Sequence, residues 1–180
     1  MVFTSQYRSP LGKILLACDG IAILGLWFEG QRYAEKLLPE QAEPGEQPLF
    51  KEAKRWLDIY FSGREPDFLP PLRYGGTTFR KQVWDILRTI PYGKTMTYGE
   101  IAAEVARQQS VSTMSAQAVG GAVGHNPISI MIPCHRVVGT NGSLTGYAGG
   151  IARKVRLLEL ERADLSQLFV PGEGTVFSEH

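Results

Sequence analysis

The sequence has few of the side chains that form disulfides or bind metals. It contains two cysteines, Cys18 and Cys134, and three histidines in 180 residues. Two cysteines cannot build the disulfide framework of a small secreted domain, and neither they nor the histidines show the spacing of a zinc site. We therefore expect no metal and, in a reducing compartment, two free thiols.

Long apolar runs are also missing. The longest one near the start is IAILGLWF, residues 21–28, which is far too short to cross a bilayer. The segment KILLACDG is similar to the end of a lipoprotein export signal, but only four apolar residues precede Cys18, fewer than such a signal needs. We expect an intracellular, cytoplasmic protein that does not associate with membranes.

The chain has a net charge of only +1, but its charges are unevenly distributed. Residues 1–70 hold 8 Lys and Arg against 10 Asp and Glu, whereas residues 71–165 hold 11 against 6. A basic second half suits a polyanionic partner such as a nucleic acid. An uneven surface without such a role explains the same counts equally well.

Residues 1–72 are predicted to form a small domain of strands and one helix. Three apolar segments separated by the turns SPLG and DG predict a β-meander over the first thirty residues. Apolar side chains recur every three or four positions in residues 48–63, which predicts an amphipathic helix. The stretch EPDFLPPLRYGG has three prolines and two glycines, and we place the domain boundary within it.

Residues 73–165 are predicted to form a mostly helical domain, followed by a loose tail over residues 166–180. The apolar ISIMI of residues 128–132 is expected to be a buried strand or extended segment between Pro127 and Pro133. Amphipathic patterns and caps predict helices over residues 77–90, 97–109, 115–126 and 151–164.

The two short helices over residues 97–109 and 115–126 suggest a helix-turn-helix. The second is unusual, because Gly120 and Gly121 each cost helix stability, roughly 1 kcal/mol relative to alanine. Close approach of another backbone is the usual reason for such residues. Packing against a neighbouring helix is the slightly favoured explanation, and a DNA minor groove, which suits small side chains, is the alternative.

Cys134 and His135 stand side by side in IPCHRVVG, residues 132–139. A lone cysteine after an apolar run is by default buried and structural. Here Pro133 ends the apolar run, and the cationic neighbours His135 and Arg136 would lower the pKa of the thiol. A glycine-rich loop, GTNGSLTGYAGG at residues 139–150, follows and can form a pocket wall. These features favour a nucleophile.

A nucleophilic Cys–His pair also needs an acid that orients the imidazole. In the last predicted helix, Ile151, Val155 and Leu158 form an apolar stripe, and Glu161 follows on the same side. An inward-facing Glu161 would hold an imidazole. On spacing alone, a solvated carboxylate at the border of the stripe is the better explanation.

The segments PYGKTMTYGEIA, IPCHRVVG and YAGGIARKVRLLELE, in this order, closely resemble the O6-alkylguanine-DNA alkyltransferase family, the methylated-DNA–protein-cysteine methyltransferases. The similarity runs through most of residues 77–161, and SPLGKILLACDGIAILGLWF resembles the family's N-terminal domain. The resemblance implies an α/β (α+β) fold. Its N-terminal domain would be ribonuclease H-like, and its C-terminal domain would contain a winged-helix-like helix-turn-helix.

The resemblance also implies a single-turnover enzyme of direct-reversal DNA repair that acts as a monomer and needs no cofactor. Such a protein binds duplex DNA in the minor groove and flips an O6-alkylguanine out of the base stack. It then moves the alkyl group irreversibly to Cys134. O4-methylthymine is a further candidate substrate.

Individual residues match the family's site. The resemblance makes Cys134 the alkyl acceptor, His135 the base that deprotonates it through a water, and Glu161 the acid that orients His135. Asn126 would fix the turn before the acceptor, and Tyr98 would rotate a phosphate and donate a hydrogen bond to the flipped base. The other residues that the resemblance assigns to the site are Val137, Tyr147, Ala148, Gly149 and Lys154 for the substrate, and Ser115, Ala116, Gln117, Ala118, Gly120 and Arg136 for DNA.

Two positions depart from the family pattern. Gln117 stands where well-studied members carry an arginine that fills the gap left by the flipped base, so a positive charge is lost. We expect DNA affinity and its salt dependence to differ for this reason. Ala148 stands where some relatives have a serine that bonds the guanine oxygen, and a backbone N–H would serve instead.

Two other classes of protein stay open at this point. A non-enzymatic protein that only recognises alkylated bases is one, although such relatives replace the cysteine that Cys134 provides. A thiol hydrolase built on Cys134, His135 and Glu161 is the other, although an adjacent Cys and His cannot easily face each other directly. Turnover of thioesters or peptides would distinguish it.

Overall fold

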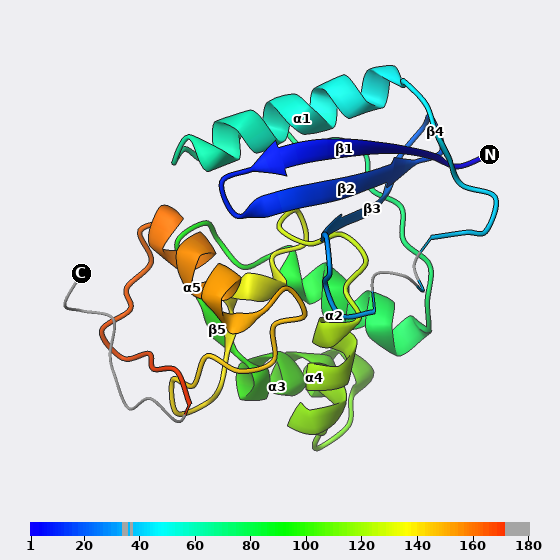
Figure 1. The fold of residues 1–180 in the computed structure, drawn as a ribbon. Coiled ribbons are helices and arrows are strands. Elements are labelled where there is room, and N and C mark those ends of the chain that lie inside the picture. The colour runs from blue at the N-terminus through cyan, green and yellow to red at the C-terminus, as the bar shows by residue number, and fades with distance from the viewer. Residues whose placement is uncertain (34–35, 37, 172–180) are drawn as a thin grey trace. The chain divides into compact units, whose positions relative to one another are not determined.

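The computed structural model describes residues 1–33, 36 and 38–171, and in this part of the chain no helix is both long enough and apolar enough to cross a membrane. The chain divides into two compact units (Figure 1). The first contains residues 1–75 and 127–131, and the second contains residues 76–126 and the chain from 132 onward. Residues 127–131 therefore group with the first unit, although they lie inside the range 73–165 expected for the second domain.

The first unit is built on a four-stranded sheet with the strand order β3-β2-β1-β4. Strands β1 to β3 form the antiparallel meander expected from the sequence, and the short β4 pairs in parallel with β1. The strands are β1 (Phe3–Ser9), β2 (Gly12–Cys18), β3 (Ile23–Phe28) and β4 (Glu43–Pro44).

Helix α1 (Pro48–Phe61) packs against β1 and β2 (Figure 1). Its buried side chains recur at three- and four-residue intervals, as the sequence predicts, because only one stripe of the helix faces the sheet. They are Leu49, Phe50, Ala53, Trp56, Leu57 and Tyr60. Burial of this stripe forms the core of the first unit.

The outer edge of β3 holds two segments that come from farther along the chain. Leu72 forms a parallel bridge with Ile23, and Ile128 forms another with Leu26. The N–H of Leu26 donates to the carbonyl of Pro127 at 3.0 Å. This edge is therefore covered at both positions.

The buried segment 128–132 is not a continuous strand, because a turn at residues 130 and 131 separates the bridge residues 128 and 129 from residue 132. Ile130 has φ 69°, a left-handed conformation that is uncommon for a β-branched residue and that ends any strand-like run. The sequence predicted burial correctly, since Ile128, Ile130 and Ile132 are at most 1% exposed, but an uninterrupted strand over these residues was wrong. Cys134 consequently begins a 3₁₀ turn, η2 (Cys134–Arg136), instead of following the end of a strand.

The second unit is mostly helical. Helices α2, α3 and α4 each begin after a hydroxyl side chain, from Thr77, Thr97 and Ser115, that accepts a hydrogen bond from the backbone N–H three residues later. The helices are α2 (Thr78–Leu87), α3 (Tyr98–Gln109), α4 (Ala116–Gly124) and α5 (Ile151–Leu160), and β5 (Met96–Thr97) pairs in parallel with β6 (Val137–Val138).

Helices α3 and α4 are the two consecutive helices that the sequence assigned to a helix-turn-helix. They pack against each other, and α4 also packs against α2. The indole N–H of Trp84 in α2 donates to the carbonyl of Ala122 in α4 at 2.8 Å, which fixes the position of α4. The winged-helix form of this motif stays a prediction.

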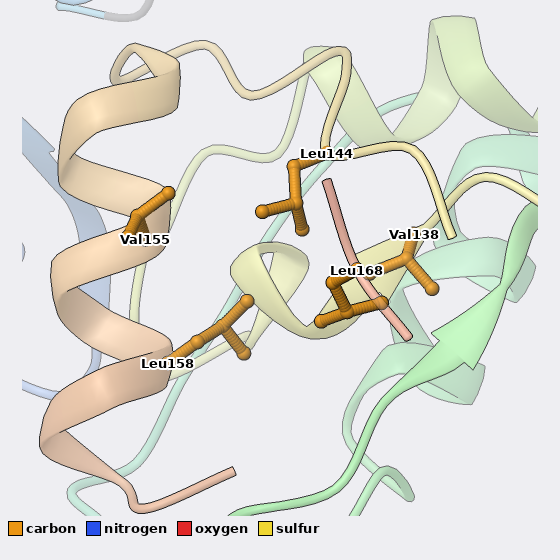
Figure 2. Close-up of a cluster of buried hydrophobic side chains, with 5 residues drawn as sticks. All are labelled: Val138, Leu144, Val155, Leu158 and Leu168. Carbon is orange, nitrogen blue, oxygen red and sulfur yellow. The ribbon is translucent and has the colours of Figure 1, made fainter. Parts of the chain in front are cut away.

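A second apolar cluster connects β6, the glycine-rich loop, α5 and the chain after α5 (Figure 2). Its buried members are Val138, Leu144, Val155, Leu158 and Leu168. The loose tail expected from residue 166 onward is thus wrong for residues up to Val170, because Leu168 is an apolar side chain that the cluster buries. Residues 172–180 of that tail lie outside the described residues.

Candidate active site

Cys134 lies in a buried, polar environment at the start of η2. It is 5% exposed, and this burial raises the pKa of its thiol. A hydrogen bond from Asn126 and the charge of Lys154 act in the opposite direction, because they stabilise the thiolate. The sequence analysis assigned this effect to His135 and Arg136 as cations, whereas the cation that acts on the thiol is Lys154.

Asn126 also fixes the chain immediately before Cys134. Its Nδ2 donates to the carbonyl of Ile132 at 2.7 Å, and the side chain is buried. The amide therefore connects the end of α4 to the residue two positions before the thiol. The resemblance implied this role for Asn126, and the hydrogen bond is compatible with it.

Lys154 and Tyr98 meet at the carbonyl oxygen of Thr145. Lys154 Nζ donates to it at 3.0 Å and Tyr98 Oη donates to it at 3.1 Å. Burial lowers the pKa of Lys154 to about 8, although a thiolate at Cys134 would attract the ammonium charge. Burial and then the charge of Cys134 raise the pKa of Tyr98 to about 12, so the phenol keeps its proton at neutral pH.

Tyr98 lies between the glycine-rich loop and α4. A Cβ added to Gly146 would come within 2.7 Å of Tyr98 Oη, and this glycine has φ 80°, so the loop passes the phenol at a distance that only glycine allows. On the other side, a Cβ added to Gly120 would make an ordinary contact with the Tyr98 ring at 3.8 Å.

His135 and Glu161 form a buried pair. His135 Nε2 lies 2.6 Å from Glu161 Oε2, and both side chains are fully buried. A carboxylate only accepts hydrogen bonds, so Nε2 carries the proton and Nδ1 is the basic nitrogen of the neutral ring. The spacing-based expectation of a solvated Glu161 was wrong, because the residue that ends α5 turns its carboxylate toward η2.

Arg136 forms a second, bidentate pair with the same carboxylate. Its Nε donates to Glu161 Oε1 at 2.8 Å and its Nη2 donates to Oε2 at 3.1 Å, and the N–H of Gly93 donates to Oε1 at 3.0 Å. Arg136 Nη1 donates to the carbonyl of Ile90 at 2.7 Å, and the Arg136 side chain is only 11% exposed. The resemblance placed Arg136 among DNA contacts, whereas this guanidinium is directed at Glu161.

Burial and, to a smaller extent, the charge of Arg136 lower the pKa of His135 and so favour its neutral form. Burial alone would raise the pKa of Glu161, but the hydrogen bonds and charges of His135 and Arg136 outweigh it and hold the pKa well below the ordinary value. Burial lowers the pKa of His135 even though Glu161 is next to it. Arg136 supplies the charge that balances Glu161, so the imidazole stays neutral and can accept a proton.

The N-terminal half of α4 presents an exposed row of small side chains. Ser115, Ala116, Gln117 and Ala118 are exposed, whereas Val119, Ala122 and Val123 face the core. A Cβ added to Gly121 would have no atom within 4 Å, and the same holds for Gly124. The favoured explanation of the adjacent pair Gly120 and Gly121, tight packing against a neighbouring helix, is therefore wrong for Gly121, whereas Gly120 lies beside the Tyr98 ring of α3.

The remaining predicted substrate residues lie on β6 and the loop that follows it. Val137 and Tyr147 are buried, and Ala148 is half-buried. The carbonyl of Gly149 accepts a hydrogen bond from Arg153 Nη1 at 3.1 Å, which connects the loop to the first turn of α5. These residues belong to the same unit as Cys134.

Two parts of the site that were not predicted are backbone groups, the carbonyl of Thr145 and the N–H of Gly93. Nearly every residue carries these groups, so no side-chain pattern could have indicated them. The role of Arg136 was missed because its reach to Glu161 depends on how α5 packs. Within the described ranges, no group of three or more His, Cys, Asp or Glu side chains could hold a metal ion.

Two family models match the chain in succession. Residues 2–74 match the 6-O-methylguanine DNA methyltransferase, ribonuclease-like domain, and residues 78–163 match the 6-O-methylguanine DNA methyltransferase, DNA binding domain. The β-sheet unit and the helical unit correspond to these two descriptions.

Curated relatives and solved structures agree with this match. The methylated-DNA–protein-cysteine methyltransferase of Haemophilus influenzae is 40% identical over 162 residues, which cover 89% of this chain and 87% of the relative. The protein of that name in Mycobacterium tuberculosis strain H37Rv is 44% identical over 163 residues, with coverages of 91% and 94%. The crystal structure of Mycobacterium tuberculosis OGT in complex with DNA has a TM-score of 0.76 at 42% identity and covers 89% of this chain and 92% of that one.

Proposed function

Because this chain belongs to the 6-O-methylguanine DNA methyltransferase family, we propose that it repairs DNA by moving an alkyl group from the O6 atom of guanine in a duplex to the sulfur of Cys134. The observation that carries the proposal is the placement of Cys134 beside Asn126 and Lys154 in a buried site. A hydrogen-bond donor and a cation stabilise the thiolate, which is the nucleophilic form of cysteine.

The first step is the removal of the Cys134 proton. Neutral His135 accepts this proton at Nδ1 through a water molecule, and Glu161 stabilises the imidazolium that results. The bidentate pair with Arg136 keeps Glu161 ionised throughout. Adjacent residues on a 3₁₀ turn do not need to touch for this step, because the water carries the proton.

In the second step, the thiolate attacks the alkyl carbon in line with the carbon–oxygen bond. The S–C bond forms as the C–O bond breaks, and the electron pair of the broken bond stays on the guanine oxygen. The base regains the proton that the thiol lost, so the products are guanine and an S-alkylcysteine. Lys154 has N–H donors besides the one that the Thr145 carbonyl accepts, and the single O–H of Tyr98 turns from that carbonyl to the bound base, so both stabilise the charge that develops on the leaving oxygen.

The reaction uses each molecule once, because a thioether is not cleaved under cellular conditions. No step requires a redox partner or an activated methyl donor, since the substrate itself carries the alkyl group. We assign the remaining pocket residues, Val137, Tyr147, Ala148 and Gly149, to binding of the flipped base.

The DNA-binding surface that we propose is the exposed row on α4, Ser115, Ala116, Gln117 and Ala118 together with Gly120. Small side chains there allow close approach of a minor groove, and open space above Gly121 leaves room for a DNA backbone. Gln117 then fills the gap left by the flipped base and bonds the unpaired partner base. We further propose that the chain acts as a monomer in the cytoplasm.

The proposal is tested by intact-protein mass spectrometry after exposure to an excess of O6-methylguanine duplex. We expect one added methyl group per molecule, located at Cys134 by peptide mapping, and no further addition after one equivalent. The Cys18→Ala variant is the matched control and should accept the methyl group normally. Transfer to a Cys134→Ala variant, or repeated turnover, would contradict the proposal.

A further inference from the structure

Residues 165–170 contact the glycine-rich loop beside the proposed acceptor site, although they follow the region that the family model matches. The N–H of Leu144 donates to the carbonyl of Phe169 at 2.9 Å, and the N–H of Phe169 donates to the carbonyl of Gly142 at 3.0 Å. These two backbone hydrogen bonds form a parallel bridge between Ser143 and Phe169, the pairing found in parallel sheets.

The side chain of Leu168 adds an apolar anchor to these bonds. Figure 2 shows it among Val138, Leu144 and Leu158, so it lies between β6, the loop and α5. It is 5% exposed, and the partly buried side chains of Leu165 and Val170 pack against the same cluster. Three apolar side chains of the segment, Leu165, Leu168 and Val170, therefore pack on one common cluster.

Gly142 brings the two backbones into direct contact. Its φ is 92°, and a Cβ added there would overlap the carbonyl oxygen of Gln167. A side chain at this position could not be accommodated without moving the segment, because the neighbouring atom belongs to the backbone.

The loop residue after Leu144 is Thr145, whose carbonyl accepts hydrogen bonds from both Tyr98 and Lys154. Leu144, which residues 165–170 hold through its N–H and its buried side chain, thus directly precedes the residue whose carbonyl positions Tyr98 and Lys154. Movement of Leu144 would displace Thr145 and its carbonyl, since a rigid trans peptide fixes the distance between the Cα atoms of consecutive residues.

We propose that residues 165–170 are a strap that positions the Thr145 carbonyl, and through it Tyr98 and Lys154, for alkyl transfer. The inference rests on the proposed function, and it assigns the strap a positioning role with no contact to the reacting atoms. It predicts that loss of the strap slows the chemical step while DNA binding stays the same, because the strap is not part of the exposed row on α4.

The test is single-turnover methyl transfer from an O6-methylguanine duplex to the full-length chain, with duplex concentration varied. Leu168→Ala should lower the limiting rate constant by roughly 10- to 100-fold, the cost of a misplaced catalytic group, and leave the half-saturating duplex concentration within about twofold. Leu168→Met should restore the rate, because it refills the cluster. Hydrogen exchange at the N–H groups of Leu144 and Phe169 should become faster in Leu168→Ala alone.

Leu49→Ala, which opens a similar cavity in the core of the first unit, is the matched control and should leave the limiting rate unchanged. A wild-type rate in Leu168→Ala, or equal slowing in Leu49→Ala, overturns the strap. If Leu168→Ala does not fold, Leu168→Val removes less volume and should slow transfer to a smaller extent. Failure of the unmodified chain to accept any methyl group would instead overturn the proposed function, and the strap with it.

Discussion

Two cations divide the electrostatic roles around Cys134. Arg136 neutralises Glu161 and leaves His135 uncharged, whereas Lys154 is the cation that acts on the sulfur. The two assignments could not be exchanged, because a guanidinium can bind both carboxylate oxygens and keeps its charge, whereas a buried lysine can lose its proton.

Replacement of Lys154 should move the pH dependence of methyl transfer. Burial raises the pKa of Cys134, so the thiolate fraction and the rate increase with pH on the alkaline side. In Lys154→Met the thiolate loses its cation, the pKa rises further, and the profile moves to higher pH. For each increase of one in that pKa, the rate at neutral pH should fall roughly tenfold.

The measurement is the single-turnover rate constant across the neutral and alkaline range. Lys51→Met, which removes an exposed lysine from α1, is the matched control and should keep the original profile. An unchanged profile in Lys154→Met would mean that Lys154 does not act on the sulfur.

At the scale of elements, α4 combines a buried face with an exposed face of unusually small residues. Val119, Ala122 and Val123 keep the helix on the core, and Trp84 holds it through the carbonyl of Ala122. Gly121 and Gly124 have no neighbouring atom where a side chain would lie, so their low helix propensity is a cost without a compensating contact inside the described structure. We connect this cost to the proposed approach of DNA.

Gln117→Arg should strengthen binding to an O6-methylguanine duplex and make it more sensitive to salt. One additional contact between a cation and a phosphate changes the slope of log affinity against log salt by about −0.9. The measurement is duplex affinity at several salt concentrations in a Cys134→Ala background, which prevents reaction. Gln41→Arg, an exposed position in the other unit, adds the same charge and should leave the slope unchanged.

The sequence predicted the elements whose pattern comes from one buried face. Helices α1 to α5 fall within the predicted ranges, and the meander β1 to β3 was confirmed. The turn geometry at Ile130 and the 3₁₀ turn at Cys134 could not be predicted, because three buried isoleucines indicate burial but not the hydrogen bonds of the backbone. The packed strap could not be predicted either, since the apolar residues of LSQLFV follow no helical or strand period that would indicate a buried face.

At the scale of the whole molecule, the completed reaction should reduce stability. An alkyl group adds volume at Cys134, which is only 5% exposed in the unreacted protein. It also prevents the sulfur from forming the thiolate that would balance the charge of buried Lys154. Extra volume in a packed site typically costs about 1–3 kcal/mol, and we expect the free energy of unfolding to fall by this amount after methylation.

Urea unfolding of the same preparation before and after reaction with the duplex measures this difference. A Cys134→Ala sample treated in parallel is the control, and its free energy of unfolding should not change. Equal stability of the methylated and unmethylated protein would show that the site has room for the product.

The sheet of the first unit has one further consequence, which concerns contacts between copies of the chain. A strand edge with unpaired N–H and carbonyl groups can recruit the same edge of a second molecule and start aggregation. Here β4 lies along the start of β1 and carries Glu43 and Pro44, a charge and a residue without an N–H, while Leu72 and Ile128 bridge to the opposite edge on β3. The segment around Ile128, which leads toward Cys134, thus also occupies an edge on which a neighbouring molecule would otherwise pair. Strand β4 and these two bridging segments therefore oppose self-association of the chain.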